Sequence, residues 1–163
     1  MDSTISIVNQ NEGPLFAIAG GNYRIVISGA ATNGNYAVIE MTVPPGGGPP
    51  PHEHPAIQEM FYILEGEVTF KTEAGMQLVG QNDFVNIPLG GGVHCFKNTS
   101  DAYARLLCTV VPAGLENLFE EIGTPVAPGE ILPVPELTEE RKAFLKEMDQ
   151  KYGIKTYPPF FLG

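Results

Sequence analysis

The feature that most constrains the fold is a series of short apolar segments, separated by glycine- and proline-containing turns, between residues 15 and 111. Residues 36–43 alternate apolar and polar side chains with a period of two, which is the pattern of a half-buried strand. Strands this short, recurring about every 8–12 residues, are typical of an antiparallel sandwich or barrel. The sequence therefore predicts an all-β domain over residues 15–111, preceded by an N-terminal arm over residues 1–14.

The expected strands are rich in β-branched and aromatic residues and are bounded by turn residues. They cover residues 23–29, 36–43, 58–64, 68–71, 76–79, 84–87, 93–97 and 103–111. Asn33 and Gly34 predict a tight hairpin turn between the first two of these strands, because both residue types tolerate a positive φ angle.

Beyond residue 111 the apolar period becomes helical, so residues 112–163 are expected to form a C-terminal helical extension. One predicted helix buries Leu115, Leu118, Phe119 and Ile122 and ends at Gly123. A second helix begins after a Thr138 cap and ends at Gly153. Its buried face is expected to hold Phe144, Leu145, Met148 and Tyr152. These faces would cover the end or edge of a barrel, or a neighbouring subunit.

The charge balance excludes several classes of partner. The chain has 19 acidic and nine basic residues and a formal net charge of -10, which argues against binding to nucleic acid or to an anionic membrane surface. No signal peptide is evident at the N-terminus, and no apolar run approaches the roughly 18 residues of a membrane span. We expect a soluble, cytoplasmic protein.

Histidine is scarce, and its spacing is the main clue to chemistry. The chain has three histidines, His52, His54 and His94. Residues two apart on a strand share a face, so His52 and His54 can converge on one point. We expect the following strand to run back antiparallel, so that Glu59 reaches the same face. With His94 turned inward, the set suits one divalent ion among Fe, Mn, Ni, Co, Cu and Zn. Histidine pairs on strands are nevertheless more often packed or exposed than metal-bound.

The spacing of these residues resembles the two-part signature of the cupin superfamily over residues 46–98. The first part holds Gly46, His52, His54, Glu59 and Gly66, and the second holds Pro88, Gly91, His94 and Asn98. Asn82 stands where the family usually has glycine, and one extra residue follows Pro88. The resemblance implies a double-stranded β-helix, or jelly-roll barrel, with a metal ion held inside by His52, His54, Glu59 and His94.

Residues 112–125 and 151–154 also resemble bacterial single-domain cupins related to quercetin 2,3-dioxygenase. That resemblance implies a metal-dependent dioxygenase acting with O2 on a small aromatic or flavonol-like hydroxy-ketone, with Glu59 as catalytic base. Inward-facing Phe61, Ile63 and Phe96 would line the substrate pocket, and the helix around Leu118 would cover its mouth. A homodimer is expected on the same grounds.

Other functions stay open at this point, because one fold hosts many chemistries. The alternatives are a cupin that binds a metal and a small molecule without turnover, as a sensor or storage protein, and a cupin isomerase or decarboxylase. Cys95 and Cys108 are expected to be buried, reduced thiols, although a disulfide between neighbouring strands is possible in principle. Glu53 lies between the paired histidines and by parity faces away from them, either exposed or paired.

Overall fold

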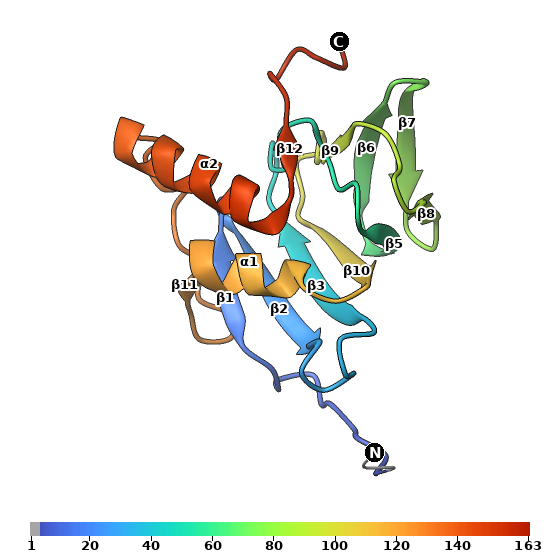
Figure 1. Cartoon of the computed structure of the whole chain (residues 1–163), viewed down its shortest axis with the longest axis vertical. Coiled ribbons are helices and arrows are strands. Elements are labelled where there is room, and N and C mark those ends of the chain that lie inside the picture. The colour runs from blue at the N-terminus through green and yellow to red at the C-terminus, as the bar shows by residue number, and fades with distance from the viewer. Residues whose placement is uncertain (1–3) are drawn as a thin grey trace.

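The structure is a computed structural model that describes residues 4–163. Within these residues the strands form two antiparallel sheets, shown in Figure 1. The larger sheet has the order β11-β1-β2-β3-β10-β5-β8, and the smaller has the order β12-β4-β9-β6-β7. Helices follow the last long strand. The predicted all-β, jelly-roll fold with C-terminal helices is therefore confirmed.

The elements have the following bounds. The strands are β1 Leu15–Ile18, β2 Gly21–Ile27, β3 Ala37–Val43, β4 His52–Glu53, β5 Gln58–Glu65, β6 Glu67–Thr72, β7 Gly75–Gly80, β8 Phe84–Ile87, β9 His94–Lys97, β10 Ala104–Val111, β11 Thr124–Pro125 and β12 Lys155–Thr156. The helices are α1 Leu115–Ile122 and α2 Glu139–Tyr152. The sequence patterns do not predict β11 and β12, because a strand of two residues has no measurable periodicity.

The hydrophobic core lies between the sheets and is built from alternate residues of the long strands. On β3 the buried residues are Ala37, Ile39, Met41 and Val43, and on β10 they are Ala104, Leu106, Cys108 and Val110. The smaller sheet contributes Val68, Phe70 and Phe96. The period of two predicted for residues 36–43 is therefore confirmed, with its apolar side facing inward.

The connection between β2 and β3 is longer than the tight hairpin predicted from Asn33 and Gly34. Both residues have the expected positive φ angles, 53° and 79°, but the loop spans residues 28–36. Within this loop the backbone N–H of Gly29 donates to the buried carboxylate of Glu116 on α1 at 2.7 Å, and the N–H of Gly114 donates to the same carboxylate at 2.7 Å. The longer loop therefore places a backbone donor beside α1.

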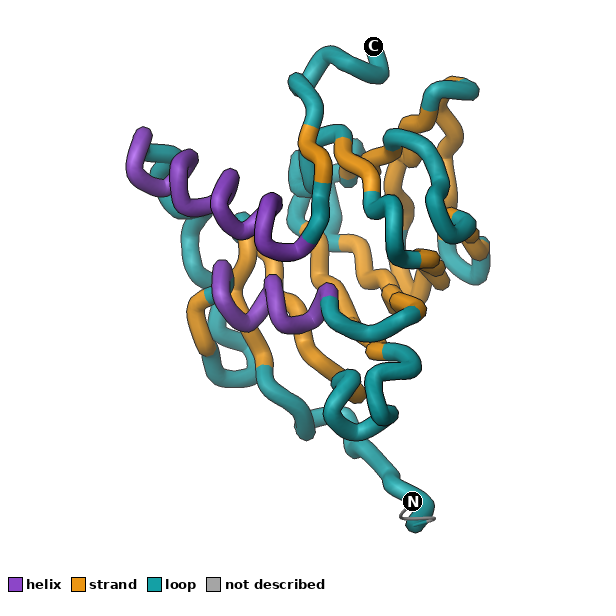
Figure 2. Tube along the Cα trace, viewed as in Figure 1, coloured by secondary structure: helices purple, strands orange, loops and turns teal. Residues whose placement is uncertain are grey.

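Helix α1 lies over β1 and β3 of the larger sheet, and α2 lies beside α1 (Figure 2). The predicted apolar face of α1 is confirmed, since Leu115, Leu118 and Phe119 are buried. The predicted face of α2 is only partly correct: Met148 is buried, whereas Phe144, Leu145 and Tyr152 are half-buried. Within residues 4–163, no helix has both the length and the apolar character needed to cross a membrane.

Replacing Glu116 by alanine should lower the free energy of unfolding by about 2 kcal/mol, because the half-buried N–H groups of Gly29 and Gly114 would lose their acceptor. Glu120 is exposed on the same helix, so Glu120→Ala is a matched control and should cost less than about 0.5 kcal/mol. Urea denaturation of both variants measures the difference. Equal losses in the two variants would contradict the assigned role of Glu116.

Candidate metal centre

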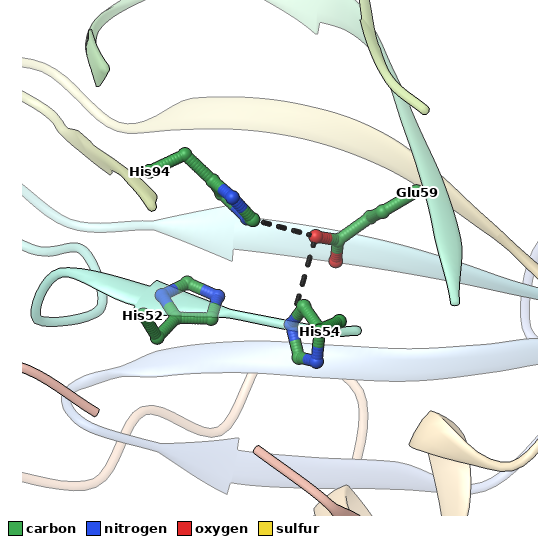
Figure 3. A group of neighbouring side chains, drawn as sticks. All are labelled: His52, His54, Glu59 and His94. Carbon is green, nitrogen blue, oxygen red and sulfur yellow. Dashed lines mark hydrogen bonds and ion pairs between the residues drawn. The ribbon is translucent and has the colours of Figure 1, made fainter. Parts of the chain in front are cut away.

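Four polar side chains meet in the interior between the sheets: His52, His54, Glu59 and His94 (Figure 3). The atoms that each could offer to a metal all lie within 4.8 Å of one another. His54, Glu59 and His94 are buried, with at most 4% of their surface exposed, and His52 is partly exposed. The structure therefore brings together all four residues that the sequence singles out as possible ligands.

The four residues come from both sheets. His52 on β4 is paired with His94 on β9, and His54 follows β4 directly. Glu59 lies on β5 of the larger sheet, between β10 and β8. The expectation that the strand of Glu59 runs back beside the paired histidines is therefore wrong. The turn that begins at His54 carries the chain into the opposite sheet, so the carboxylate of Glu59 reaches the imidazoles across the interior.

Backbone carbonyl groups orient two of the imidazole rings. His52 Nδ1 lies 2.8 Å from the oxygen of Pro50, and His94 Nδ1 lies 3.0 Å from the oxygen of Gly92. A carbonyl can only accept, so Nδ1 carries the proton in each ring and Nε2 is left with its lone pair. Partners of this kind are the usual means by which proteins orient histidines that bind a metal.

The contacts around Glu59 need a positive species between the groups. His94 Nε2 lies 3.3 Å from Glu59 Oε2, and His54 Nε2 lies 3.7 Å from the same oxygen. Because His94 already donates through Nδ1, the contact of its Nε2 with a carboxylate requires a second proton on the ring or a shared cation. Three imidazoles and one carboxylate are ligands that first-row transition metals accept.

The ring of His54 presents one of its two nitrogens, Nε2, to Glu59. Its Nδ1 atom is buried and has no hydrogen-bond partner among residues 4–163. A buried polar atom without a partner costs about 1–3 kcal/mol, and native structures contain few of them. The nitrogen of His54 that faces Glu59 is Nε2, so a metal ion in the cluster would bind this ring through Nε2, and the three imidazoles and one carboxylate present fit a divalent metal.

The protonation states also suit metal binding. Displacement of water, together with the neighbouring imidazoles, lowers the pKa of His52 to about 4, and burial lowers the pKa of His54. For Glu59, burial alone would raise the pKa, but the hydrogen bond with His94 and the nearby imidazoles outweigh it, so the net shift is downward. At neutral pH His52 and His54 are therefore neutral and Glu59 is ionised, which are the forms that bind a metal.

The predicted pocket residues Phe61, Ile63 and Phe96 all face inward and are buried. The rings of Phe61, Phe70 and Phe96 pack against one another, with centroids 5.4–5.6 Å apart. A cavity of about 700 Å³ lies on the outer face of the larger sheet and is lined by Asn22, Arg24, Glu40 and Thr42 among others. None of the four cluster residues lines this cavity. A role for Phe61, Ile63 and Phe96 in binding substrate stays a prediction.

One contact to the cluster is not predicted from the sequence. The thiol of Cys108 donates to Glu59 Oε1 at 3.4 Å, whereas His54 and His94 lie against Oε2. Cys95 and Cys108 are free and buried, as expected, and burial raises the pKa of each thiol. The alternation along β10 indicates that Cys108 faces inward, but its contact with Glu59 depends on the register between β10 and β5.

The departure of Asn82 from the family pattern has a simple structural explanation. Asn82 has a φ angle of 71°, in the left-handed region that glycine adopts freely and asparagine tolerates. Gly48, in the first glycine-rich turn, is required for a different reason. A Cβ atom there would lie 2.0 Å from the backbone oxygen of Phe96, so this turn can pass close to β9 only without a side chain.

Comparison with known proteins supports the same fold. Residues 39–110 match the family described as Cupin domain. Quercetin 2,3-dioxygenase of Bacillus subtilis (strain 168) is 28% identical to this chain over 127 residues. The match covers 78% of this chain but 37% of the Bacillus protein, so the chain spans little more than a third of that relative.

Solved structures of similar shape include three proteins with different descriptions. The polyketide cyclase RemF from Streptomyces resistomycificus has a TM-score of 0.59 and 19% identity, covering 88% of this chain and 94% of RemF. A predicted oxalate decarboxylase from Thermotoga maritima has a TM-score of 0.58 and 23% identity, with coverages of 66% and 99%. KdgF from Halomonas sp. has a TM-score of 0.60 and 13% identity, with coverages of 70% and 99%. At these identities the likeness shows the fold alone.

In the metal-free protein, the free energy of unfolding should fall as the pH drops from about 6.5 to about 4. The pKa of His52 is lowered from 6.5 to about 4, so in this range the unfolded chain binds a proton that the folded chain excludes. The contribution of His52 to the free energy of unfolding is therefore fully present above pH 6.5 and is lost as the pH falls toward 4. Urea denaturation in the presence of a chelator at several pH values should show a smaller slope for His52→Gln. Identical slopes in both proteins would contradict the assignment.

Proposed function

We propose that the chain, whose residues 39–110 match the Cupin domain family, is a metal-dependent enzyme of the oxygenase type. Its substrate would be a small aromatic or flavonol-like hydroxy-ketone that reacts with O2. The observation that carries the proposal is the cluster of His52, His54, Glu59 and His94 in the interior between the sheets. The match to quercetin 2,3-dioxygenase over most of this chain supports the reaction class.

In this proposal the three imidazoles and the Glu59 carboxylate hold one divalent transition metal ion. When bound, the ion supplies Lewis acidity and a common binding point for the substrate oxygen and O2. The donor set accepts Fe, Mn, Ni, Co, Cu or Zn, because imidazole and carboxylate ligands suit all of these ions.

The chain's own residues would contribute a base and a dry environment. Glu59 is ionised at neutral pH, and its Oε1 atom, which already accepts from Cys108, has a lone pair left to take the proton of a substrate hydroxyl group. The buried side chains of Phe61, Ile63 and Phe96 would exclude water from the reacting groups.

We also propose that the protein is a homodimer, as in the expectation from the sequence. Two large apolar side chains of β7, Met76 and Leu78, are 66% and 55% exposed at the edge of the smaller sheet. Exposed apolar residues on a sheet edge are typical of a surface that another chain covers. Sedimentation velocity measures the oligomeric state, and a monomer at all micromolar concentrations would exclude the dimer.

Titration of the metal-free protein with Co²⁺ should give about one bound ion per chain, and His94→Ala should weaken that binding by more than about 100-fold. The reason is that the variant loses one of four ligands, together with the ring that lies against Glu59. Cys95→Ala is the matched control, because Cys95 is the buried neighbour of His94 but is not part of the cluster. Equal affinity in wild type and His94→Ala would refute the metal site.

Incubation of the Fe-, Mn-, Ni-, Co- or Cu-loaded protein with a flavonol should consume the flavonol in air and not under anaerobic conditions. Absorbance of the flavonol and an oxygen electrode measure the two reactants together. Turnover that does not need O2 would indicate an isomerase or a decarboxylase instead. Binding of the flavonol without any product, with every metal, would indicate a sensor or storage protein.

A further inference from the structure

The strand that carries His52 is paired with a strand from a distant part of the chain. Strand β4 is two residues long and lies between β9 and β12. In this pairing Lys155 lies opposite Glu53, and Thr156 lies opposite His52. Figure 1 shows that the chain passes from α2 directly into β12. The second neighbour of the His52 strand is therefore a segment about 100 residues further along the chain, which the sequence pattern of the metal cluster does not include.

Side-chain contacts reinforce this pairing at Glu53. Its Oε1 atom lies 2.9 Å from Lys155 Nζ and accepts a hydrogen bond from the hydroxyl of Tyr157, also at 2.9 Å. The backbone N–H of Tyr157 donates to the oxygen of Pro51 at 2.8 Å. Glu53 is thus paired rather than exposed, and the residues on both sides of His52 are tied to the same C-terminal segment.

The other side of this segment is attached to the core through α2. Thr156 Oγ1 donates to the side-chain Oδ2 of Asp149 at 2.7 Å, and the backbone N–H of Ile154 donates to the backbone carbonyl oxygen of Asp149 at 2.8 Å. Ile154 packs against the core, and Met148, next to Asp149, is buried in it. A continuous set of contacts therefore joins the hydrophobic core to the strand that carries His52.

We propose that residues 154–157, here called the C-terminal strap, hold β4 in the conformation that binds metal. Lys155 and Tyr157 are positioning residues that act through Glu53, and the inference rests on the metal site proposed above. A two-residue strand that follows a glycine- and proline-rich turn has little order of its own. Without the strap, His52 and His54 would become ordered only when the metal binds, and the conformational entropy lost in that step would lower the affinity.

Charge alone makes the opposite prediction for one of these residues. The ammonium group of Lys155 repels a nearby cation, so its removal strengthens metal binding if simple Coulomb interaction is what matters. Loss of the strap contact weakens binding instead. Tyr157→Phe removes a hydrogen bond without changing any charge, so for this variant Coulomb interaction predicts no effect. The signs of the two changes therefore separate the strap from electrostatics.

The chain offers a matched control for both variants. Glu121 on α1 is also contacted by a lysine and the tyrosine next to it, with Lys151 Nζ at 2.8 Å from Oε1 and the Tyr152 hydroxyl on the same oxygen. This second group of three residues joins α2 to α1 and includes no member of the metal cluster. Lys151→Met and Tyr152→Phe therefore remove equivalent contacts away from β4.

The experiment is a Co²⁺ titration of the full-length metal-free protein and of the four variants, together with urea denaturation of each. Lys155→Met and Tyr157→Phe should each weaken Co²⁺ binding by about tenfold, whereas Lys151→Met and Tyr152→Phe should change it by less than about twofold. A purely structural role would lower the stability of all four variants without separating their affinities. Wild-type affinity in Tyr157→Phe, or tighter binding in Lys155→Met, would overturn the inference.

A second measurement uses the wild-type protein alone. Coupling is reciprocal, so if the strap favours metal binding, bound Co²⁺ must stabilise the strap. Trypsin cleavage after Lys155 should therefore slow by about tenfold when Co²⁺ is added, and an unchanged rate would overturn the inference. Failure of the wild type to bind Co²⁺ at all would instead refute the metal site and, with it, the strap's proposed role.

Discussion

The central constraint on this structure is the gathering of three imidazoles, two of them buried, and one buried carboxylate inside an otherwise apolar interior. Polar groups in such an environment are costly unless they are paired, and here the pairing is incomplete: His54 Nδ1 has no partner among the described residues. His94 and Glu59 approach through atoms that need a proton or a cation between them. The imidazole nitrogens that face Glu59 are therefore arranged around a position where a metal ion could bind.

The parity of residues on the long strands could be predicted from the sequence. Glu59, Phe61 and Ile63 share the inward face of β5, and His94 and Phe96 share that of β9, because side chains alternate on a strand. The sheet to which β5 belongs could not be predicted, since a turn of a few residues decides whether a chain stays in its sheet or crosses to the other. The two-residue strand β12 was equally beyond prediction, because only tertiary contacts define it.

The fold determines where the side chains of the cluster lie, but it does not determine which reaction they take part in. Proteins of similar shape include a polyketide cyclase and a predicted oxalate decarboxylase, so the barrel alone does not select a reaction. Other side chains surround the cluster in this interior. Cys108 contacts the carboxylate oxygen Oε1 of Glu59, and Phe61, Phe70 and Phe96 form an aromatic group in the same core. These neighbours, rather than the ligands, would decide which substrate reacts.

The four candidate ligands do not have equal structural support. Glu59 lies within an eight-residue strand that is paired on both sides, and His94 lies opposite His52 on one side and Thr72 on the other. His52 and His54 depend on a strand of two residues, so they are the ligands whose position is most easily lost. Stabilising contacts matter most at the least ordered element of a site, because there they remove the largest entropy cost of binding. The ligands would then set the affinity of the site, and the distant residues that pair with Glu53 would adjust it.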